Sequence, residues 1–114
     1  MRKDARYLDD MIEAIERIER YTASGSQVVE RDDLIGTWVL HHLQIVGEAA
    51  RALSEPLKQA HPEVAWRRIA DLRNVLVHEY FGVDMAIVRA ILDQDLPDLK
   101  AKVAAIALTV EREA

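Results

Sequence analysis

The sequence predicts an all-α fold, a compact antiparallel bundle of four to five main helices. Half of its 114 residues are apolar but only 5% are aromatic, a composition that favours helix over sheet. Apolar residues recur at three- and four-residue steps in several long segments, whereas no alternating strand pattern or internal repeat appears. We therefore expect residues 1–114 to form a single helical domain with short connections.

The first half of the chain predicts two long helices. Residues 4–21 carry an apolar stripe at helical spacing, and the turn residues of 22–26 follow as a loop. A second helix is expected to begin near Asp32 or Asp33, either of which can cap it, and to end near Leu53. Its apolar residues cover roughly half of the helix circumference. We therefore expect it to pack on two sides, at the centre of the bundle or in a subunit interface.

Glycines and prolines punctuate this pattern. Gly36 and Gly47 lie on one flank of the second helix, where they either permit the close approach of a neighbouring helix or occur by chance. Pro56 and Pro62 divide the following segment into short pieces. Each of these prolines suits the first turn of a short helix, where the missing N–H is tolerated.

The second half predicts three further helices. One is expected to run from about Trp66 to Gly82, which can end it in a left-handed cap. Asp84 can cap a short helix, and Asp95 can cap the last one, with Pro97 in its first turn.

Charge and composition exclude several classes of protein. The formal net charge of −5 argues against a protein that binds long nucleic acid with its whole surface, although Arg67, Arg68 and Arg73 can form a local basic patch. Without cysteine, the chain has no disulfide or thiol chemistry. No run reaches the ~18 apolar residues of a membrane span, and the first residues lack an apolar signal core. We expect a cytoplasmic protein that does not associate with membranes.

Four side chains with useful chemistry lie close together near the end of the third long helix. Arg73 can hold a phosphate in its planar fork, and His78 can accept and donate a proton near neutral pH. Asn74 adds an amide and Tyr80 a hydroxyl group. This combination suits cleavage of a phosphodiester without a metal ion, so we expect no metal site.

Helical geometry separates these side chains. In a regular helix with Ile69 at 0°, Arg73 and Tyr80 fall at about 40° and 20°, beside the core face, whereas Asn74 and His78 fall at about 140° and 180°, away from it. Arg73 and His78 can then meet only if the long arginine side chain reaches round, if the helix distorts, or if a second subunit supplies one of them. This suggests a site in a groove or across a two-fold axis, and a dimer is the more economical solution for a small bundle. The alternative is an ordinary solvated histidine with an arginine nearby by chance.

The sequence resembles the HepT-like toxins of the HEPN superfamily. Arg73-x4-His78-x-Tyr80 matches the RxxxxHxY signature of that family. Four further blocks resemble family segments in the same order and with the motif cover most of residues 5–103: Ile45-Val46-Gly47-Glu48-Ala49-Ala50-Arg51, Trp66 with Ile69, Tyr80-Phe81-Gly82-Val83-Asp84, and Asp95-Leu96-Pro97-Asp98-Leu99. Arg89 departs from the family, in which many relatives carry an aromatic residue at that place.

The resemblance implies a homodimeric, metal-independent ribonuclease with its two motifs near the two-fold axis. It also implies an antitoxin partner, a nucleotidyltransferase of the MntA type, which transfers AMP to the motif tyrosine, here Tyr80, and silences the toxin. The chain then needs no cofactor of its own, since ATP and Mg²⁺ belong to the partner. RNA is the implied substrate.

The residues receive the following roles in this hypothesis. His78 acts as general acid or base, Arg73 stabilises charge on the phosphate, and Asn74 orients His78 or the phosphate. Glu48 pairs with an arginine of the motif region, while Arg67 and Arg68 guide phosphate groups.

Two alternatives stay open. The chain can instead be a non-catalytic helical binding partner of a nucleotidyltransferase, which its wide apolar helix face and acidic surface fit equally well. His41, Gln44 and Glu48 share a helix face that is either a metal site or, more simply, a solvated polar stripe. His42 falls within the apolar arc, where we expect an interface histidine with a satisfied ring rather than a metal ligand.

Overall fold

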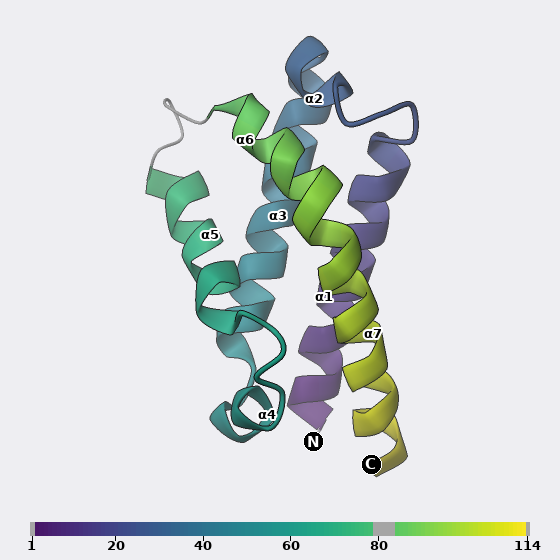
Figure 1. Cartoon of the computed structure of the whole chain (residues 1–114), viewed down its shortest axis with the longest axis vertical. Coiled ribbons are helices and arrows are strands. Elements are labelled where there is room, and N and C mark those ends of the chain that lie inside the picture. The colour runs from purple at the N-terminus through teal and green to yellow at the C-terminus, as the bar shows by residue number, and fades with distance from the viewer. Residues whose placement is uncertain (1, 79–83, 114) are drawn as a thin grey trace.

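Two long antiparallel helices, α1 (Arg2–Tyr21) and α3 (Asp33–Ala52), form the framework of the fold (Figure 1). The structure, a computed structural model, describes the backbone of residues 2–78 and 84–113 and the side chains of residues 3–72 and 84–110. These ranges are helical apart from short connections and contain no strand. The prediction of an all-α fold is therefore confirmed.

The two framework helices follow their sequence signals closely. The apolar stripe of α1 is buried almost completely and comprises Leu8, Met11, Ile15 and Ile18. Helix α3 begins directly after Asp32, whose carboxylate accepts hydrogen bonds from the backbone N–H groups of Leu34 at 3.0 Å and Ile35 at 3.1 Å. These bonds satisfy two donors that have no partner within the helix, as the predicted cap requires.

A short helix that the sequence did not predict, α2 (Val28–Arg31), packs across the start of α3. A Cβ atom at Gly36 would lie 2.8 Å from the backbone carbonyl oxygen of Val29, closer than such atoms approach. Glycine therefore permits the close approach of α2 to α3. Of the two explanations for Gly36, the structural one holds.

Helix α4 (Glu55–Ala60) turns the chain at the lower end of the bundle. Ser54 caps it, with its hydroxyl oxygen accepting from the N–H of Leu57 at 3.4 Å. The buried carboxylate of Asp4, only 2% exposed, accepts hydrogen bonds from the Ser54 backbone N–H at 2.9 Å and from its hydroxyl at 2.6 Å. One aspartate therefore ties the start of α1 to the corner between α3 and α4.

The two prolines of this region behave differently. Pro56 lies in the first turn of α4, as predicted. Pro62 lies in a turn and starts no helix, so that prediction is wrong. The indole N–H of Trp66 donates to the carbonyl oxygen of His61 at 3.0 Å and holds this turn closed. The next helix consequently begins only at Trp66.

Helix α5 (Trp66–His78) packs against α3, on a different side from α1. Helix α3 thus has neighbours on two sides, as its wide apolar arc predicts, and it lies between α5 and α1 (Figure 1). Helix α5 runs antiparallel to α3, so its C-terminal half lies toward the end of the bundle where α3 begins.

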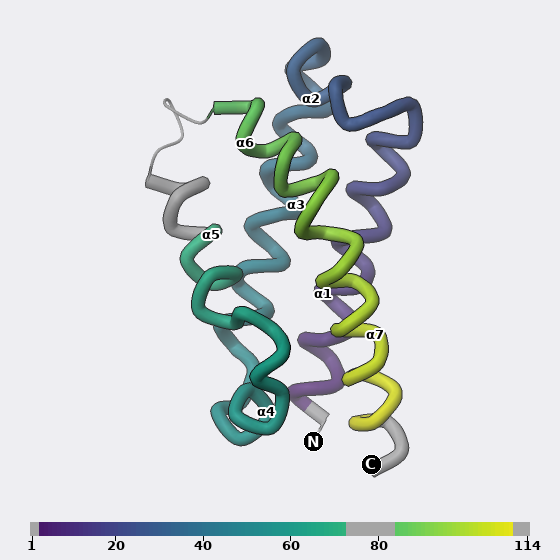
Figure 2. The backbone as a smooth tube through the Cα atoms, viewed as in Figure 1, coloured from purple at the N-terminus to yellow at the C-terminus, as the bar shows by residue number. Residues whose placement is uncertain are grey.

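The last part of the described chain is one continuous helical rod, drawn in green to yellow in Figure 2. It comprises α6 (Met85–Ala90), the π-helical segment η2 (Ile91–Asp95) and α7 (Leu96–Glu113). Asp84 caps α6 as predicted, by accepting from the N–H of Ala86 at 2.9 Å.

The prediction that Asp95 caps a separate last helix is wrong. The N–H of Leu96 bonds to the carbonyl oxygen of Ile91, five residues earlier, so the helix widens for one turn instead of stopping. Pro97 has no N–H to bond to the carbonyl of Asp93, and its ring would crowd that carbonyl in a regular α-helix. A π-turn relieves this conflict while the backbone stays helical.

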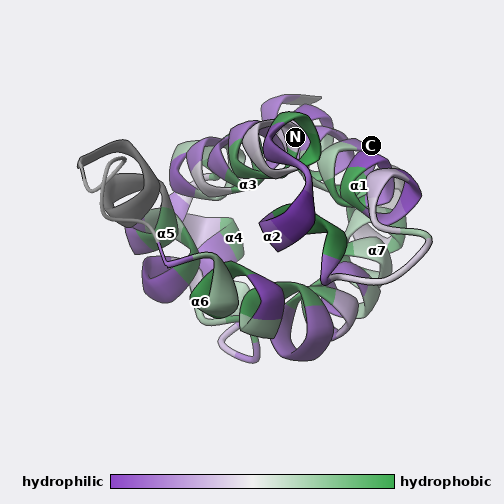
Figure 3. Cartoon of the chain, turned by 90° about the horizontal axis from the view of Figure 1, so that it is seen from above, coloured by the Kyte–Doolittle hydropathy of each residue, from purple (hydrophilic) through white to green (hydrophobic). Residues whose placement is uncertain are grey.

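The core lies in the common interior around which the helices are arranged when the bundle is viewed from above (Figure 3). Helix α7 packs against α1 and contributes Val103 and Ile106, while α3 contributes Val39, Leu43 and Val46. Among the described residues, no helix is long and apolar enough to cross a membrane.

Candidate functional site

Three of the predicted site residues, Arg73, Asn74 and His78, lie in the C-terminal half of α5. The helical backbone is described through His78, but the side chains of these residues lie outside the described part of the chain. Tyr80 lies outside it entirely. Their predicted separation into two helix faces stays a prediction. The structure describes the first half of α5 and the helices beside it.

Glu48 lies on α3, the helix on which α5 packs, and its side chain is exposed. It takes part in a hydrogen-bonding or electrostatic interaction. Its predicted pairing with an arginine of the motif region stays a prediction.

Arg67 and Arg68, adjacent in the first turn of α5, face different sides of that helix. The guanidinium Nη2 of Arg68 lies 3.6 Å from Oδ2 of Asp95, across from α5 on η2. Arg67 instead lines a hollow between α4 and α5. Consecutive residues of a helix are about 100° apart, which explains the divergence. The two arginines therefore do not form one basic patch.

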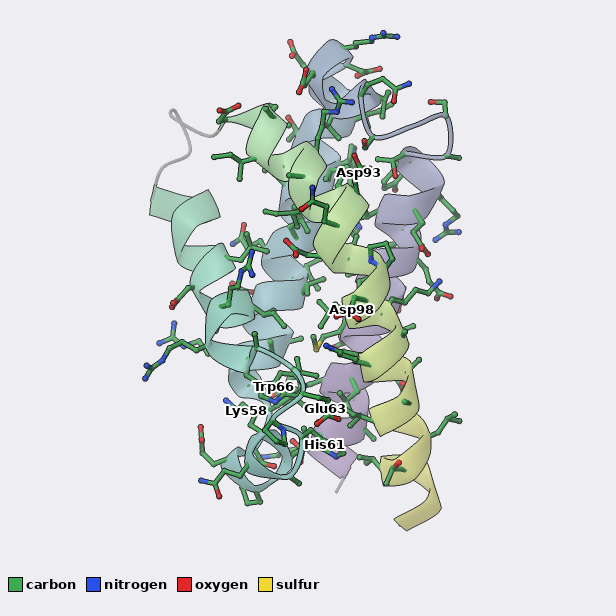
Figure 4. The ribbon with its side chains drawn as sticks, in the orientation of Figure 1. Lys58, His61, Glu63, Trp66, Asp93 and Asp98 are labelled. Atoms are coloured by element: carbon green, nitrogen blue, oxygen red, sulfur yellow. The ribbon has the colours of Figure 1, made fainter. Side chains whose placement is uncertain are left out.

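The α4–α5 hollow has a volume of about 490 Å³ and is lined mainly by polar side chains. Three cations border it, namely Arg51 from the end of α3, Lys58 from α4 and Arg67 from α5, together with the carboxylates of Glu55 and Asp71. Lys58 and Trp66 mark the junction of α4 and α5 in Figure 4. An anion with hydrogen-bond acceptors suits such a lining.

A second hollow of about 390 Å³ lies on the other side of α5, between α3, α5 and the α6–α7 rod. Apolar side chains line most of it, including Ile69 and Leu72 of α5 and Ile91 of η2. The Arg68–Asp95 pair stands at its edge. The two faces of α5 thus differ in chemistry, one hollow being cationic and the other apolar.

The turn that leads into α5 is attached to α7. Nζ of Lys102 donates to the backbone carbonyl of Glu63 at 3.0 Å. The pKa of the Glu63 carboxyl is lowered chiefly by a hydrogen bond from its own backbone N–H, with smaller contributions from His61 and Lys102. Figure 4 shows His61 and Glu63 in this turn. A fixed turn gives α5 a defined starting point beside the α4–α5 hollow.

A second anchor of α7 lies two residues earlier in the same helix. Nζ of Lys100 donates to Glu19 of α1 at 2.8 Å, and this hydrogen bond raises the pKa of the lysine. Both anchors hold α7 to the rest of the bundle, and the Lys102–Glu63 anchor also borders the apolar hollow.

Aromatic rings gather where α1 meets the first half of α3. His42 is buried, and its Nδ1 lies 2.7 Å from the backbone carbonyl oxygen of Trp38, to which it donates. The rings of Tyr21 and Trp38 pack against it at 5.8 and 5.5 Å between centroids. His42 thus has the satisfied ring that its place in the apolar arc predicts. In the described part of the chain, no group of three histidine or acidic side chains could hold a metal ion, and this includes His41 and Glu48.

A family model described as Ribonuclease HepT-like matches residues 11–106 of the chain. The chain belongs to the HepT-like ribonuclease family. It is 38% identical over 100 residues to a Thermococcus cleftensis protein named "Probable ribonuclease HepT", and the match covers 84% of this chain and 88% of that relative.

Two further relatives of this HepT-like chain are similar over most of its length. A "Putative RNase" of Caldanaerobacter subterraneus subsp. tengcongensis is 31% identical over 98 residues, covering 85% of this chain and 88% of the relative. A Methanocaldococcus jannaschii protein named "Gamma-glutamylcyclotransferase and putative RNase" is 31% identical over 109 residues, or 90% of this chain, which spans about half (47%) of that longer protein. No solved structure matches the chain significantly.

Sequence reasoning about this HepT-like chain missed Arg51 and Lys58 as neighbours of the motif helix. Each lies in a different helix from Arg67, and only the turn through α4 brings the three together. Arg51 did fall within the Glu48-containing block that resembles the family. Its place at the end of the predicted second helix, next to the turn that leads to the motif helix, was the signal that could have identified it.

Proposed function

We propose that this HepT-like chain is a metal-independent endoribonuclease and the toxin of a toxin–antitoxin pair in the cytoplasm. Its membership of the HepT-like ribonuclease family carries this proposal. The fold supports it, because α5 carries positions 73, 74 and 78 of the motif on one helix, whose first half borders a cationic hollow.

The motif suits cleavage through the 2′-hydroxyl of RNA. His78 removes the proton from this hydroxyl, and the oxygen attacks the adjacent phosphorus atom. Arg73 stabilises the charge that builds on the phosphate oxygens, and Asn74 orients His78 or the phosphate. The bond from phosphorus to the 5′-oxygen breaks and that oxygen takes up a proton. The products are a 2′,3′-cyclic phosphate and a free 5′-hydroxyl, so no metal-bound water is required.

The proposed site is composite and forms across a homodimer. Arg73 and His78 are about 140° apart on a regular helix, so a second subunit can supply the missing half of each site. Exposed apolar side chains on α3 support a dimer, because Leu34 is 68% and Trp38 44% exposed in one chain. Leu34 and Trp38 are one turn apart on α3, and contiguous exposed apolar side chains favour an interaction surface.

The partner in this proposal is an MntA-like nucleotidyltransferase. It transfers AMP from ATP to the hydroxyl of Tyr80, with ATP and Mg²⁺ bound by the partner. The added phosphate brings bulk and negative charge next to the motif. RNA is then excluded sterically, and Arg73 is occupied by the new anion.

The ribonuclease proposal is tested with purified protein and labelled single-stranded RNA in the presence of EDTA. We expect cleavage that EDTA leaves intact, a cyclic phosphate at the new 3′ end, and no cleavage by His78→Ala. His41→Ala, which removes an exposed histidine of α3, is the matched control and should cleave normally. Full cleavage by His78→Ala, or loss of cleavage in EDTA, contradicts the mechanism.

The modification proposal is tested by co-expression with the nucleotidyltransferase and measurement of intact mass. We expect an AMP adduct on the wild-type chain and on Tyr7→Phe, but none on Tyr80→Phe. An adduct that persists in Tyr80→Phe contradicts the assignment of the acceptor.

A non-catalytic role is the second candidate. The exposed Leu34 and Trp38 and the net charge of −5 also fit a helical subunit that only binds the nucleotidyltransferase. A stable complex with the partner, together with no RNA cleavage by the free chain, would favour this role.

A further inference from the structure

The α4–α5 hollow gathers cations in a protein that is acidic overall. Arg51, Lys58 and Arg67 come from three different helices and line one depression, although the chain has a net charge of −5. Glu55 and Asp71 are the carboxylates that border it. The lining therefore carries three positive and two negative charges.

The cations of this hollow differ in whether they are paired with nearby acceptors. Nζ of Lys58 lies 3.4 Å from Oε1 of Glu55 and donates a hydrogen bond to the backbone carbonyl of Arg51 at 3.4 Å. The charge of Lys58 is therefore largely compensated by these two neighbours. The guanidinium groups of Arg51 and Arg67 form no ion pair with any residue in the described ranges 3–72 and 84–110. Two planar forks are thus available for an anion, and Asp71 is the nearby charge that opposes them.

Two positions of the motif, 74 and 78, lie on the same side of α5 as the hollow. From Arg67, steps of three or four residues along the helix lead through Asp71 to positions 74 and 78. Position 78 lies about 16 Å along the axis from position 67, at 1.5 Å per residue. An RNA strand that reaches position 78 can therefore continue along this face of α5 to the hollow.

We propose that the α4–α5 hollow binds a backbone phosphate of the RNA strand, distant from the bond that is cleaved, through the guanidinium groups of Arg51 and Arg67. This inference rests on the proposed ribonuclease function. The planar guanidinium fork matches phosphate oxygens, and at about 490 Å³ the hollow has ample room for the group. An acidic peptide offers carboxylates to the same forks, but the face that the hollow shares with positions 74 and 78 of the motif favours RNA.

The geometry assigns the phosphate contact to Arg67 rather than Arg68. The side chain of Arg68 is paired with Asp95 on the other side of α5, at the edge of the apolar hollow. Asp71 opposes an anion in the α4–α5 hollow, so its removal should strengthen binding.

Binding is measured by fluorescence anisotropy with a labelled single-stranded RNA of about twelve nucleotides, a length within the usual range of such sites. His78→Ala is the background, so that the RNA stays intact. We expect Arg51→Gln and Arg67→Gln each to weaken binding about fivefold. Each should also reduce the slope of log affinity against log salt by about 0.7, the value for one phosphate contact on a single strand. Asp71→Asn should bind more tightly.

Two control variants distinguish a specific phosphate contact from a general effect of charge. Arg20→Gln removes an exposed arginine near the end of α1, at the opposite end of the bundle from α4, and should leave affinity unchanged (Figure 1). Arg67→Lys keeps the charge and loses the fork, so it should recover only part of the affinity. An equal loss in Arg20→Gln and Arg67→Gln would reveal a general charge effect and overturn the site.

Cleavage kinetics separate this site from the proposed function. With the cleavage-competent chain, Arg67→Gln should raise KM for the long RNA without changing kcat, and should leave cleavage of a dinucleotide unchanged because it cannot reach the hollow. Normal cleavage of the long RNA by both arginine variants overturns the phosphate site but leaves the ribonuclease intact. Absence of binding and cleavage by the wild-type chain refutes both. Binding of a polyglutamate peptide but not RNA assigns the hollow to a protein partner.

Discussion

Replacement of Asp4 by alanine should destabilise the bundle far more than its place near the N-terminus suggests. Its carboxylate is 2% exposed and accepts two hydrogen bonds from Ser54, one from the backbone N–H at 2.9 Å and one from the hydroxyl at 2.6 Å. The same hydroxyl oxygen caps α4 by accepting from the N–H of Leu57. The substitution thus loosens α1, the end of α3 and the start of α4 together.

The magnitude follows from these contacts. Hydrogen bonds to a charged group contribute about 1.5–3 kcal/mol each, and the cost of burying the Asp4 carboxylate, which alanine avoids, offsets part of their sum. We expect Asp4→Ala to lower the free energy of unfolding by about 2–4 kcal/mol. Ser54→Ala removes one of the bonds and the cap, and should cost about 1–2 kcal/mol. Because both substitutions break the same bond, the double variant should lose about 1–2 kcal/mol less than the sum.

Urea unfolding followed by circular dichroism measures these values at a fixed protein concentration, since association changes apparent stability. A loss of 1 kcal/mol corresponds to about 4 °C in Tm for a domain of this size. The matched control is Asp9→Ala on the exposed face of α1, which should stay within about 0.5 kcal/mol of wild type. Equal stability of Asp4→Ala and Asp9→Ala would refute the reasoning, as would strict additivity of the Asp4 and Ser54 substitutions.

Two other perturbations test the local arguments. In Gly36→Ala, helix propensity favours alanine by about 1 kcal/mol. The new Cβ atom would lie 2.8 Å from the carbonyl oxygen of Val29, and such overpacking costs about 1–3 kcal/mol. We expect the variant to unfold at a lower urea concentration than wild type, and a higher midpoint would show that α2 moves away freely. The lowered pKa of Glu63 means that its ionised form stabilises the fold above the ordinary value of 4.5 and that this contribution is lost as pH falls through the folded-state pKa. Glu63→Gln should therefore be less stable than wild type at pH 7 and indistinguishable from it in acid, and a difference in stability that does not shrink in acid would contradict the cause assigned to the shift.

Local signals were sufficient where a helix is long and its cap belongs to its own sequence. The apolar stripe of α1 and the Asp32 cap of α3 act within a few residues of themselves, so periodicity and side-chain chemistry predicted both helices. Helix α6 is short, but its Asp84 cap was predictable because it too acts on a backbone N–H only two residues away.

Local signals failed where the same residues fit two different backbone conformations and contacts elsewhere in the fold select one of them. Pro62 and Pro97 each fit a first helical turn, but Pro62 lies in a turn that Trp66 closes from the next helix. Pro97 follows a π-turn, because continuing the rod lets Leu96 stay buried against the core. The four residues of α2 are too few for a periodic signal, and contact with α3 supports that helix.

The same distinction between local and tertiary signals applies to the candidate site. The sequence by itself determined the all-α class, the main helices and the Arg73–Tyr80 motif, because periodicity, caps and motif spacing are properties of neighbouring residues. Only the tertiary structure decided that Arg67 and Arg68 face different hollows and that Arg51 and Lys58 join Arg67. These groupings depend on the turn through α4 and on the packing of α5 against α3, which bring together residues from separate helices.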